Sequence, residues 1–374
     1  MKIKPFKVEQ WMNEYEMDAI YNIAETCVDS ITLNELLELS NVDNDDFMKE
    51  LLNIKMTYGH ITGNPKFKAE ISKLYNDINS DNIVTTNGGI GANNLVIQTI
   101  VESGDGVVSV IPTYQQLYSI PDSIGANVKI SFLKKENDFL PDIEELKNMI
   151  DSSTKLICLN NPNNPTGTLI PENILLQIVK LAEEVGSYIL CDEAYRGLSQ
   201  DGSYQKSIVD IYDKGISTSS MSKVFSLAGL RLGWIASKDS ILMDSINAHR
   251  DYSIISCGII DEVFATLALE NSERLLDRNM KIINKNLQIL DEWIKIHPHF
   301  SYVKPKAGTT ALVFYDYNIN SEDFCKGLME HSKTFLTPGS CFEYENSFRL
   351  GYANSEDILI KGLQNLEDYC KLFQ

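Results

Sequence analysis

Lys223 is the side chain of this sequence whose surroundings best suit covalent chemistry. It lies in the segment STSSMSKVFSLAGLRLGW (217–234), among serine and apolar residues, with Arg231 eight residues later. Desolvation and a nearby cation both lower the pKa of a lysine amine, and the neutral amine is the form that attacks a carbonyl carbon. We therefore predict a lowered pKa and an imine-forming role for Lys223. A surface lysine, the alternative, leaves the neighbouring serines unexplained.

Two carboxylates end an apolar segment that precedes this lysine. Asp192 and Glu193 directly follow the residues SYILC (187–191). A carboxylate at the end of a buried strand loses hydration, and it needs a cationic partner to stay charged there. We predict that one of the two faces a partly desolvated space, and an acid solvated at the surface is the alternative.

Two further loops offer groups that bind an anion and a polar ring. The segment TNGGIGAN, in the 85–93 region, places clustered glycines at the expected start of a helix, where backbone N–H groups approach an anion. A plain tight turn is the alternative for this segment. The segment NNPNNPTG (160–167) is made rigid by its two prolines, and it presents the amides of Asn161 and Asn164.

These loops all follow short apolar segments that are typical of strands buried on both faces of a sheet. Helical segments alternate with them, and the clearest is 171–185, which ends before Gly186. This alternation predicts an α/β fold with a mostly parallel sheet flanked by helices, which collects ligands at the carboxyl ends of its strands. The expected strands are residues 82–86, 106–111, 128–133, 155–160, 187–193, 215–220 and 233–237.

The two ends of the chain predict a smaller α+β domain. Residues from 271 onward combine a long helix, a hairpin-like region, a helix at 321–332, a short strand that contains Arg349 and a final helix. The first 50 residues are helical in pattern, with a Leu-rich helix at 33–39 and an acidic loop at 41–46. We therefore expect a large domain at 50–270 and a small domain built from 1–49 and 271–374.

The composition excludes several classes of partner. The 374 residues include 33 Lys and Arg against 52 Asp and Glu, a net charge of −19, whereas nucleic acid needs a basic face. The same charge disfavours anionic membranes, and no apolar stretch reaches the length of a membrane span or a signal peptide. Seven cysteines without a C-x-x-C pair favour a reducing compartment, so we expect the cytoplasm. No His or Cys spacing fits a metal site.

The candidate residues together match the needs of pyridoxal 5′-phosphate. Its phosphate needs a glycine-rich helix start with serine and arginine side chains. Its ring nitrogen needs a carboxylate that keeps it protonated, and its aldehyde needs a lysine. The four loops supply all of these groups.

The same segments resemble the class I/II aminotransferases, which are fold-type I pyridoxal-phosphate enzymes. The matching motifs are NNPNNPTG, DEAY, SxSK with AGLRLGW, and FRLGYA, in the family's order between Tyr58 and Arg349. The resemblance implies an enzyme that moves an amino group between an amino acid and a 2-oxo acid through a Schiff base at Lys223. It implies that Lys223 then acts as the general base and acid of the reaction.

The resemblance also implies the contacts to the cofactor ring. Asp192 matches the partner of the ring nitrogen, and Tyr195 and Asn164 match the pair that hydrogen-bonds the phenolic oxygen. Tyr114, in IPTY (111–114), matches the aromatic residue that stacks on the ring, and a core tyrosine is the alternative.

The implied phosphate and substrate contacts complete this site. Tyr58 resembles the tyrosine that reaches the phosphate of a neighbouring subunit, which implies a homodimer with shared active sites. Arg349 resembles the arginine that binds the substrate α-carboxylate with two hydrogen bonds, as guanidinium geometry allows. The phosphate donors are the backbone of Gly89 and Ile90 and the side chains of Ser220, Ser222 and Arg231.

One segment departs from the family pattern. The residues NIAETCVDS (22–30) lack the glycine that family members carry near the substrate carboxylate, so the contact is altered or supplied by Glu25, Thr26 or Cys27. This variation resembles capreomycidine-synthase-like enzymes, which act on an arginine-derived substrate by elimination and cyclisation. A carboxylate such as Glu25 suits a cationic side chain.

Two alternatives to an aminotransferase follow. The first is a pyridoxal-phosphate-dependent lyase or elimination/cyclisation enzyme, although the intact RLGW (231–234) favours amino transfer. The second is a ligand-sensing module of a transcription regulator, which the acidic charge and the absence of a DNA-binding pattern at the N-terminus disfavour.

Overall fold

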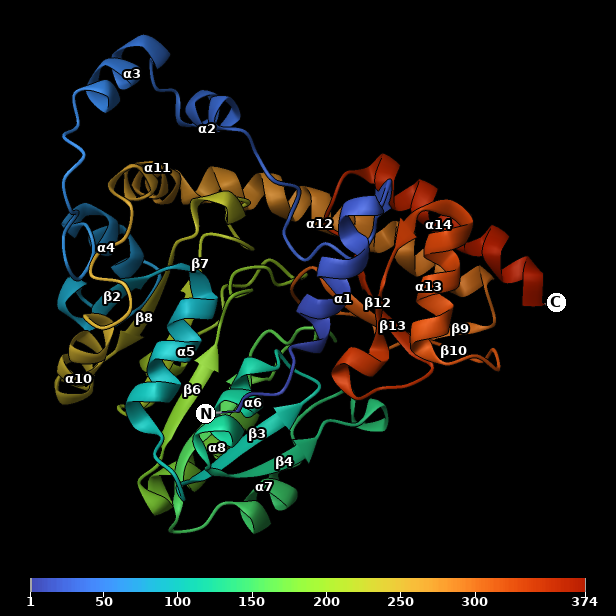
Figure 1. The fold of residues 1–374 in the computed structure, drawn as a ribbon, viewed down its shortest axis with the longest axis horizontal. Coiled ribbons are helices and arrows are strands. Elements are labelled where there is room, and N and C mark those ends of the chain that lie inside the picture. The colour runs from blue at the N-terminus through green and yellow to red at the C-terminus, as the bar shows by residue number, and fades with distance from the viewer. Residues whose placement is uncertain (1, 374) are drawn as a thin grey trace.

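The computed structural model describes residues 2–373 and centres on a seven-stranded sheet (Figure 1). The strand order is β2-β8-β7-β6-β5-β3-β4, in which the neighbours from β7 to β4 are parallel and β8 is antiparallel to both of its neighbours. The predicted mostly parallel sheet is confirmed. Its strands are β2 (Ile83–Thr86), β3 (Gly106–Ile111), β4 (Asn127–Phe132), β5 (Thr154–Asn160), β6 (Tyr188–Asp192), β7 (Gly215–Ser220) and β8 (Gly233–Ser237).

Helices cover both faces of this sheet because successive apolar residues of each strand point to opposite sides. In β5, Leu156 packs into the core shared with α5, α6 and α10, whereas Ile157 packs into the core shared with α4, α7, α8 and α11. Cys158 and Cys191 are buried core residues. The helices are α4 (Pro65–Ser72), α5 (Gly88–Ile100), α6 (Gln116–Ile124), α7 (Ile143–Met149), α8 (Glu172–Val185), α9 (Ile208–Ile211), α10 (Ser240–Arg250) and α11 (Ile259–Glu270).

One predicted strand is less buried than expected. β4 lies at the edge of the sheet, and Phe132 at its end is 47% exposed. The expectation of burial on both faces is wrong for this strand, because it has a neighbour on one side only. The helix expected at 171–185 is confirmed as α8, with Pro171 as its N-cap residue and Gly186 in the left-handed conformation after its end.

A second, antiparallel sheet is formed by the C-terminal third of the chain. Its order is β12-β13-β10-β9, and a separate parallel pair joins β1 (Tyr21–Asn22) to β11 (Thr334–Phe335). In Figure 1 the long helix α12 runs from α11 toward this sheet, where α13 and α14 pack. The elements are α12 (Ser272–Ile296), β9 (Phe300–Tyr302), β10 (Thr310–Tyr315), α13 (Ser321–Ser332), β12 (Thr337–Pro338), β13 (Ser347–Gly351) and α14 (Glu356–Cys370).

The N-terminal residues form three helices, α1 (Lys7–Tyr15), α2 (Leu33–Ser40) and α3 (Asn44–Leu52). Residues 41–46 were expected to form an acidic loop, and this is partly wrong. Asp43 caps α3 through a hydrogen bond to the N–H of Asp46. Asp45 and Asp46 lie in the first turn, where carboxylates interact favourably with the helix dipole.

Helix α1 bridges the two sheets beside the carboxyl ends of the central strands. The indole Nε1 of Trp11 donates to the carbonyl of Leu336, between β11 and β12, at 2.9 Å. The N–H of Lys7 donates to Oε1 of Gln115, just before α6, at 2.9 Å. Within residues 2–373, no helix combines the length and the apolar character that crossing a membrane requires.

Candidate active site

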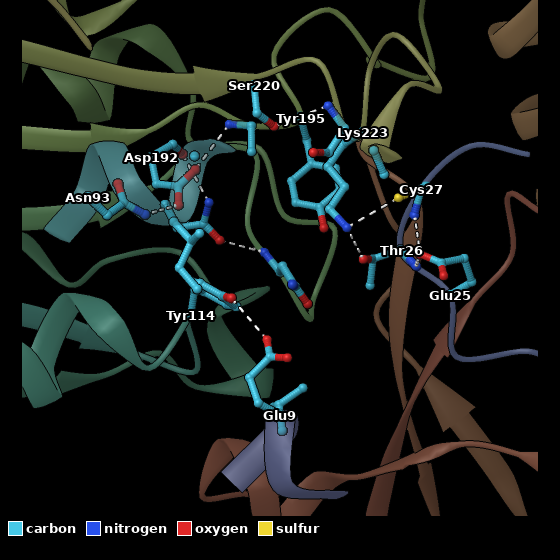
Figure 2. Close-up of a pocket in the computed structure, with 18 of the residues that line it drawn as sticks. Glu9, Glu25, Thr26, Cys27, Asn93, Tyr114, Asp192, Tyr195, Ser220 and Lys223 are labelled. Carbon is cyan, nitrogen blue, oxygen red and sulfur yellow. Dashed lines mark hydrogen bonds between the residues drawn. The ribbon is translucent and has the colours of Figure 1, made fainter. Parts of the chain in front are cut away.

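A cavity of about 370 Å³ opens at the carboxyl ends of β5, β6 and β7 and at the start of α5. Residues of α1, of the 22–30 segment and of β13 close it from the other side, as Figure 2 shows for Glu9, Glu25, Thr26 and Cys27. The structure brings together there the predicted site residues except Tyr58 and Asn161, whose Oδ1 instead accepts from the N–H of Ile170 at 2.9 Å. The residues brought together are Glu25, Gly89, Ile90, Tyr114, Asn164, Asp192, Tyr195, Ser220, Ser222, Lys223, Arg231 and Arg349.

Tyr58 is a predicted residue that stands apart. Its side chain is 78% exposed, and it does not line the cavity of its own chain. Its expected contact is with the site of a neighbouring subunit, so this role stays a prediction.

Asp192 is held at the end of β6 by an amide rather than by a cation. Nδ2 of Asn93 donates to its Oδ2 at 2.7 Å, and the N–H of Ala194 donates to its Oδ1 at 3.1 Å. The hydroxyl of Thr218 in turn donates to Oδ1 of Asn93 at 2.6 Å, which fixes the orientation of the amide. Burial raises the pKa of Asp192, and these hydrogen bonds oppose the rise. The result is a desolvated carboxylate whose position is fixed and which forms no ion pair with any residue from 2 to 373, although the charge of Lys223 also opposes the rise of its pKa.

Glu193, the next residue, is also buried, but its contacts differ from those of Asp192. Its Oε2 lies 3.0 Å from Nε of Arg196, and it also accepts hydrogen bonds from Ser207, Ser217 and the N–H of Ile208. The cationic partner that the sequence predicted for one of the two acids therefore belongs to Glu193. Asp192 is the acid that faces the cavity.

Lys223 points into the cavity toward the 22–30 segment (Figure 2). Its Nζ donates to Oγ1 of Thr26 at 2.6 Å and lies 3.4 Å from Sγ of Cys27. Burial is the largest influence on the pKa of Lys223 and lowers it, but Cys27, Tyr195 and Glu25 together raise it above its ordinary value. The expected lowering is therefore wrong.

The acidic groups around Lys223 explain this correction. Burial raises the pKa of the Cys27 thiol to about 11, and burial also raises the pKa of Tyr195. Both groups are therefore neutral at neutral pH. Burial raises the pKa of Glu25, but Lys223 and the N–H groups of its own loop lower it below the ordinary value. Glu25 is therefore the anion that stabilises the protonated form of Lys223.

The start of α5 presents glycine backbone to the cavity, and Gly88 adopts a left-handed conformation that residues with a side chain rarely take. Gly88 has a φ of +70°, and a Cβ there would lie 2.9 Å from Nη2 of Arg231. Ser220 and Ser222 are buried at the end of β7 beside it, and a Cβ on Gly89 would stand 3.6 Å from Cβ of Ser220. Backbone N–H groups at a helix start, hydroxyls and a guanidinium together are the donor set that a phosphate group needs. The cavity thus fits pyridoxal 5′-phosphate: the start of α5 would hold its phosphate, Asp192 would pair with its ring nitrogen, and Lys223 would bind its aldehyde.

Arg349 lies on β13, on the side of the cavity opposite the central strands, and is 2% exposed. Its hydrogen bonds go to uncharged oxygens, at 3.4 Å on Asn164 and at 3.2 Å on both Thr337 and the carbonyl of Ala24. Its Nε, which is buried, has no partner within residues 2–373. Burial lowers the pKa of this guanidinium. A buried guanidinium with a free N–H points to a carboxylate ligand.

The N-terminal residues complete the substrate side of this cavity. Oε1 of Glu25 accepts from the N–H groups of Thr26 at 2.7 Å and Cys27 at 2.9 Å, so this carboxylate shapes its own loop. Tyr114 donates its hydroxyl to Oε1 of Glu9 on α1 at 3.0 Å (Figure 2).

Sequence reasoning missed several residues that line the cavity, among them Asn93, Glu9 and Glu16. Asn93 lies four residues after Gly89 in α5, on the same face of the helix, and that spacing could have identified it. Glu9 and Glu16 lie outside every motif, so no sequence signal marked them.

Comparison with known proteins agrees with this geometry. A solved structure of a PLP-dependent aminotransferase from Streptococcus suis 89-1591 is 43% identical, covers 100% of this chain and 99% of its own, and has a TM-score of 0.97. A histidinol-phosphate aminotransferase of Methanococcus maripaludis is 31% identical over 75% of this chain and 73% of its own length. A capreomycidine synthase of Streptomyces vinaceus is 24% identical over 96% and 92%. The family model for aminotransferase class I and II matches residues 50–363, and the chain therefore belongs to this family.

Proposed function

We propose that this class I/II aminotransferase holds pyridoxal 5′-phosphate through Lys223 and uses the same lysine to move a proton during transfer of an amino group from an amino acid to a 2-oxo acid. The observation that carries the proposal is the meeting of Lys223, Asp192 and Arg349 in one cavity beside the glycine-rich start of α5. When bound, the cofactor supplies an aldehyde for the amino group and a protonated ring that accepts electrons.

Each residue of the chain has a defined task in this proposal. Asp192, fixed by Asn93, keeps a positive charge on the ring nitrogen that it faces. Arg349 orients the substrate by its α-carboxylate, and Asn164 and Tyr195 orient the ring from its other edge. Lys223, once displaced by substrate, would carry the α-proton at Nζ between the substrate α-carbon and the bound cofactor.

A test of this assignment measures attachment and turnover together. Borohydride reduction followed by peptide mass spectrometry is expected to place the cofactor on Lys223, and Lys223→Ala is expected to abolish both the attachment and the half-reaction with any amino acid. Retained turnover in Lys223→Ala, or attachment at another lysine, would refute the assignment.

Elimination with cyclisation is the second candidate function. The observation that favours it is the 22–30 segment, which lacks glycine and brings Glu25 to the substrate side, together with the similarity to a capreomycidine synthase. Formation of a 2-oxo acid from the amino donor, with the acceptor becoming an amino acid, supports transfer. A cyclised amino acid, or ammonia released without any acceptor, supports elimination.

We also propose a cytoplasmic homodimer with shared active sites and with a large domain at 50–270. The exposed Tyr58 supports the dimer, because its side chain does not line the cavity of its own chain, and seven buried free cysteines in residues 2–373 support a reducing compartment. Mixing Tyr58→Phe and Lys223→Ala chains tests the sharing. If the sites are shared, a mixed dimer has one site with both defects and one with neither.

A further inference from the structure

Three glutamates gather on the substrate side of the cavity, opposite the cofactor residues. Glu9 comes from α1, Glu16 from the turn that follows it, and Glu25 from the 22–30 segment, and all three line the cavity. Figure 2 shows Glu9 and Glu25 approaching the cavity from separate ribbons. We call Glu9, Glu16 and Glu25 the acidic wall.

The hydrogen bonds that the acidic wall accepts come from uncharged donors. Glu9 accepts from the hydroxyl of Tyr114 at 3.0 Å, and Glu16 accepts from Nδ2 of Asn22 at 3.0 Å. Glu25 accepts from the N–H groups of its own loop. Burial and then the charge of Glu25 raise the pKa of Glu16, so the carboxylates are close enough to repel one another. Their mutual repulsion is a cost that a bound cation removes.

Arg349 is an independent sign of a ligand in the same space. It is 2% exposed, it hydrogen-bonds to uncharged oxygens, and its Nε has no partner within residues 2–373. Burial and the charge of Glu25 raise the pKa of Glu16, and Arg349 lowers it; burial raises the pKa of Glu25, and Lys223 lowers it in the same way. When a substrate α-carboxylate binds Arg349, it neutralises the positive charge that partly offsets the negative charge of the acidic wall.

The resulting charge balance selects the side chain of the substrate. Three glutamates face two cations, Arg349 and Lys223, and an α-carboxylate adds a further negative charge, so the acidic groups stay in excess. An acidic side chain would increase this excess, and an apolar one would bury carboxylates without compensation. An ammonium or guanidinium group is the side chain that lowers the electrostatic energy of the complex.

We propose that the acidic wall makes this enzyme selective for amino acids with a positively charged side chain, and that it rejects aspartate and glutamate as amino donors. The inference rests on the proposed function, because it presumes that the α-carboxylate binds Arg349 and the amino group lies at Lys223. Glu9 and Glu16 are then specificity-determining residues rather than catalytic ones.

Arginine and citrulline give the sharpest test, because they have nearly the same shape and differ in side-chain charge. With purified holoenzyme, we expect kcat/KM of the half-reaction to be about 10- to 100-fold higher for arginine than for citrulline, the range of a hydrogen bond to a charged group. Lysine and ornithine distinguish an ammonium from a guanidinium preference. Glutamate is expected to be the poorest donor.

Variants of the wall show whether these residues cause the preference. Glu9→Gln and Glu16→Gln are expected to bring the arginine-to-citrulline ratio toward one by raising KM for arginine with little change in kcat. Glu14→Gln, at an exposed position of the same helix outside the cavity, is the matched control and is expected to keep the ratio.

The outcomes separate this inference from the proposed function. Equal or better turnover of citrulline or glutamate, or a ratio unchanged in Glu9→Gln and Glu16→Gln, overturns the acidic wall while leaving the aminotransferase assignment intact. If the wild-type holoenzyme gives no half-reaction with any amino acid, or if borohydride does not attach the cofactor to Lys223, the proposed function itself is overturned.

Discussion

The cofactor side and the substrate side of one cavity satisfy their polar groups in opposite ways. On the cofactor side, Thr218 holds Asn93 and Asn93 holds Asp192, so the acid is fixed before any ligand binds. On the substrate side, Arg349 makes hydrogen bonds of 3.4 Å to Asn164 and 3.2 Å to the carbonyl of Ala24, and its Nε has no partner within the described residues. The comparison shows that hydrogen bonds within the chain fix the side chain of Asp192 before a ligand binds. The charged groups of the substrate pocket, in contrast, are left for the substrate to neutralise.

Replacing Asp192 by Asn tests the cofactor side and has the largest expected effect. We expect the rate of the half-reaction to fall about 1,000-fold, as when a fixed electrostatic contact to the reacting group is lost. Because burial raises the pKa of Asp192 in the folded protein, its ionised form opposes folding as the pH rises through that pKa. The cofactor-free variant is therefore expected to be at least as stable as the wild type at pH 7, measured by urea unfolding. A less stable variant would show that Asp192 is a structural acid.

Glu193→Gln gives the opposite pattern at the adjacent position. Removal of this charge leaves Arg196 buried without its partner, and we expect a loss of about 3 kcal/mol in the free energy of unfolding. The kcat of the fraction that remains folded is expected to be close to that of the wild type. A stable but inactive Glu193→Gln would erase the distinction between the two neighbouring acids.

The pH dependence of substrate binding sharpens the comparison on the other side. Because burial and Glu25 raise the pKa of Glu16, this carboxylate gains its proton at a higher pH than an ordinary glutamate as the pH falls. We expect KM for arginine to rise by up to about tenfold through this range, which corresponds to about 1.4 kcal/mol. The profile for citrulline and the profile of Glu16→Gln with arginine are expected to be flatter. Identical profiles for both substrates would contradict a role for Glu16.

Thr218→Val has the smallest expected effect, because it leaves Asp192 and Asn93 in place. It removes the hydroxyl that orients the amide of Asn93, and we expect a cost of about 1 kcal/mol, or about fivefold in the half-reaction rate. Thr218→Ser, which keeps the hydroxyl, is expected to restore the rate. Failure of the serine variant to do so would mean that Thr218 acts through packing.

The fold and the cofactor side were largely predictable because their signals are local. The seven strands were visible as apolar segments. Asp192 ends one of them, and Lys223 and Asn164 lie in the loops that follow two others. The substrate side was not predictable in this way. Glu25 and Cys27, which shift the pKa of Lys223, lie almost 200 residues before it in the chain. Glu9 and Glu16 reach the site only through the packing of α1.

The attachment of α1 has a consequence for how this enzyme can change. Trp11 and Lys7 fasten that helix to Leu336 and Gln115, at sites that belong to neither the lysine loop nor the glycine-rich turn. Helix α1 therefore carries Glu9 into the cavity on an attachment of its own, whereas the 22–30 segment contacts Lys223 directly through Thr26 and Cys27. Substitutions in α1 can thus change the substrate side without removing a hydrogen bond of Lys223, so that specificity can evolve at this helix while the lysine keeps its surroundings.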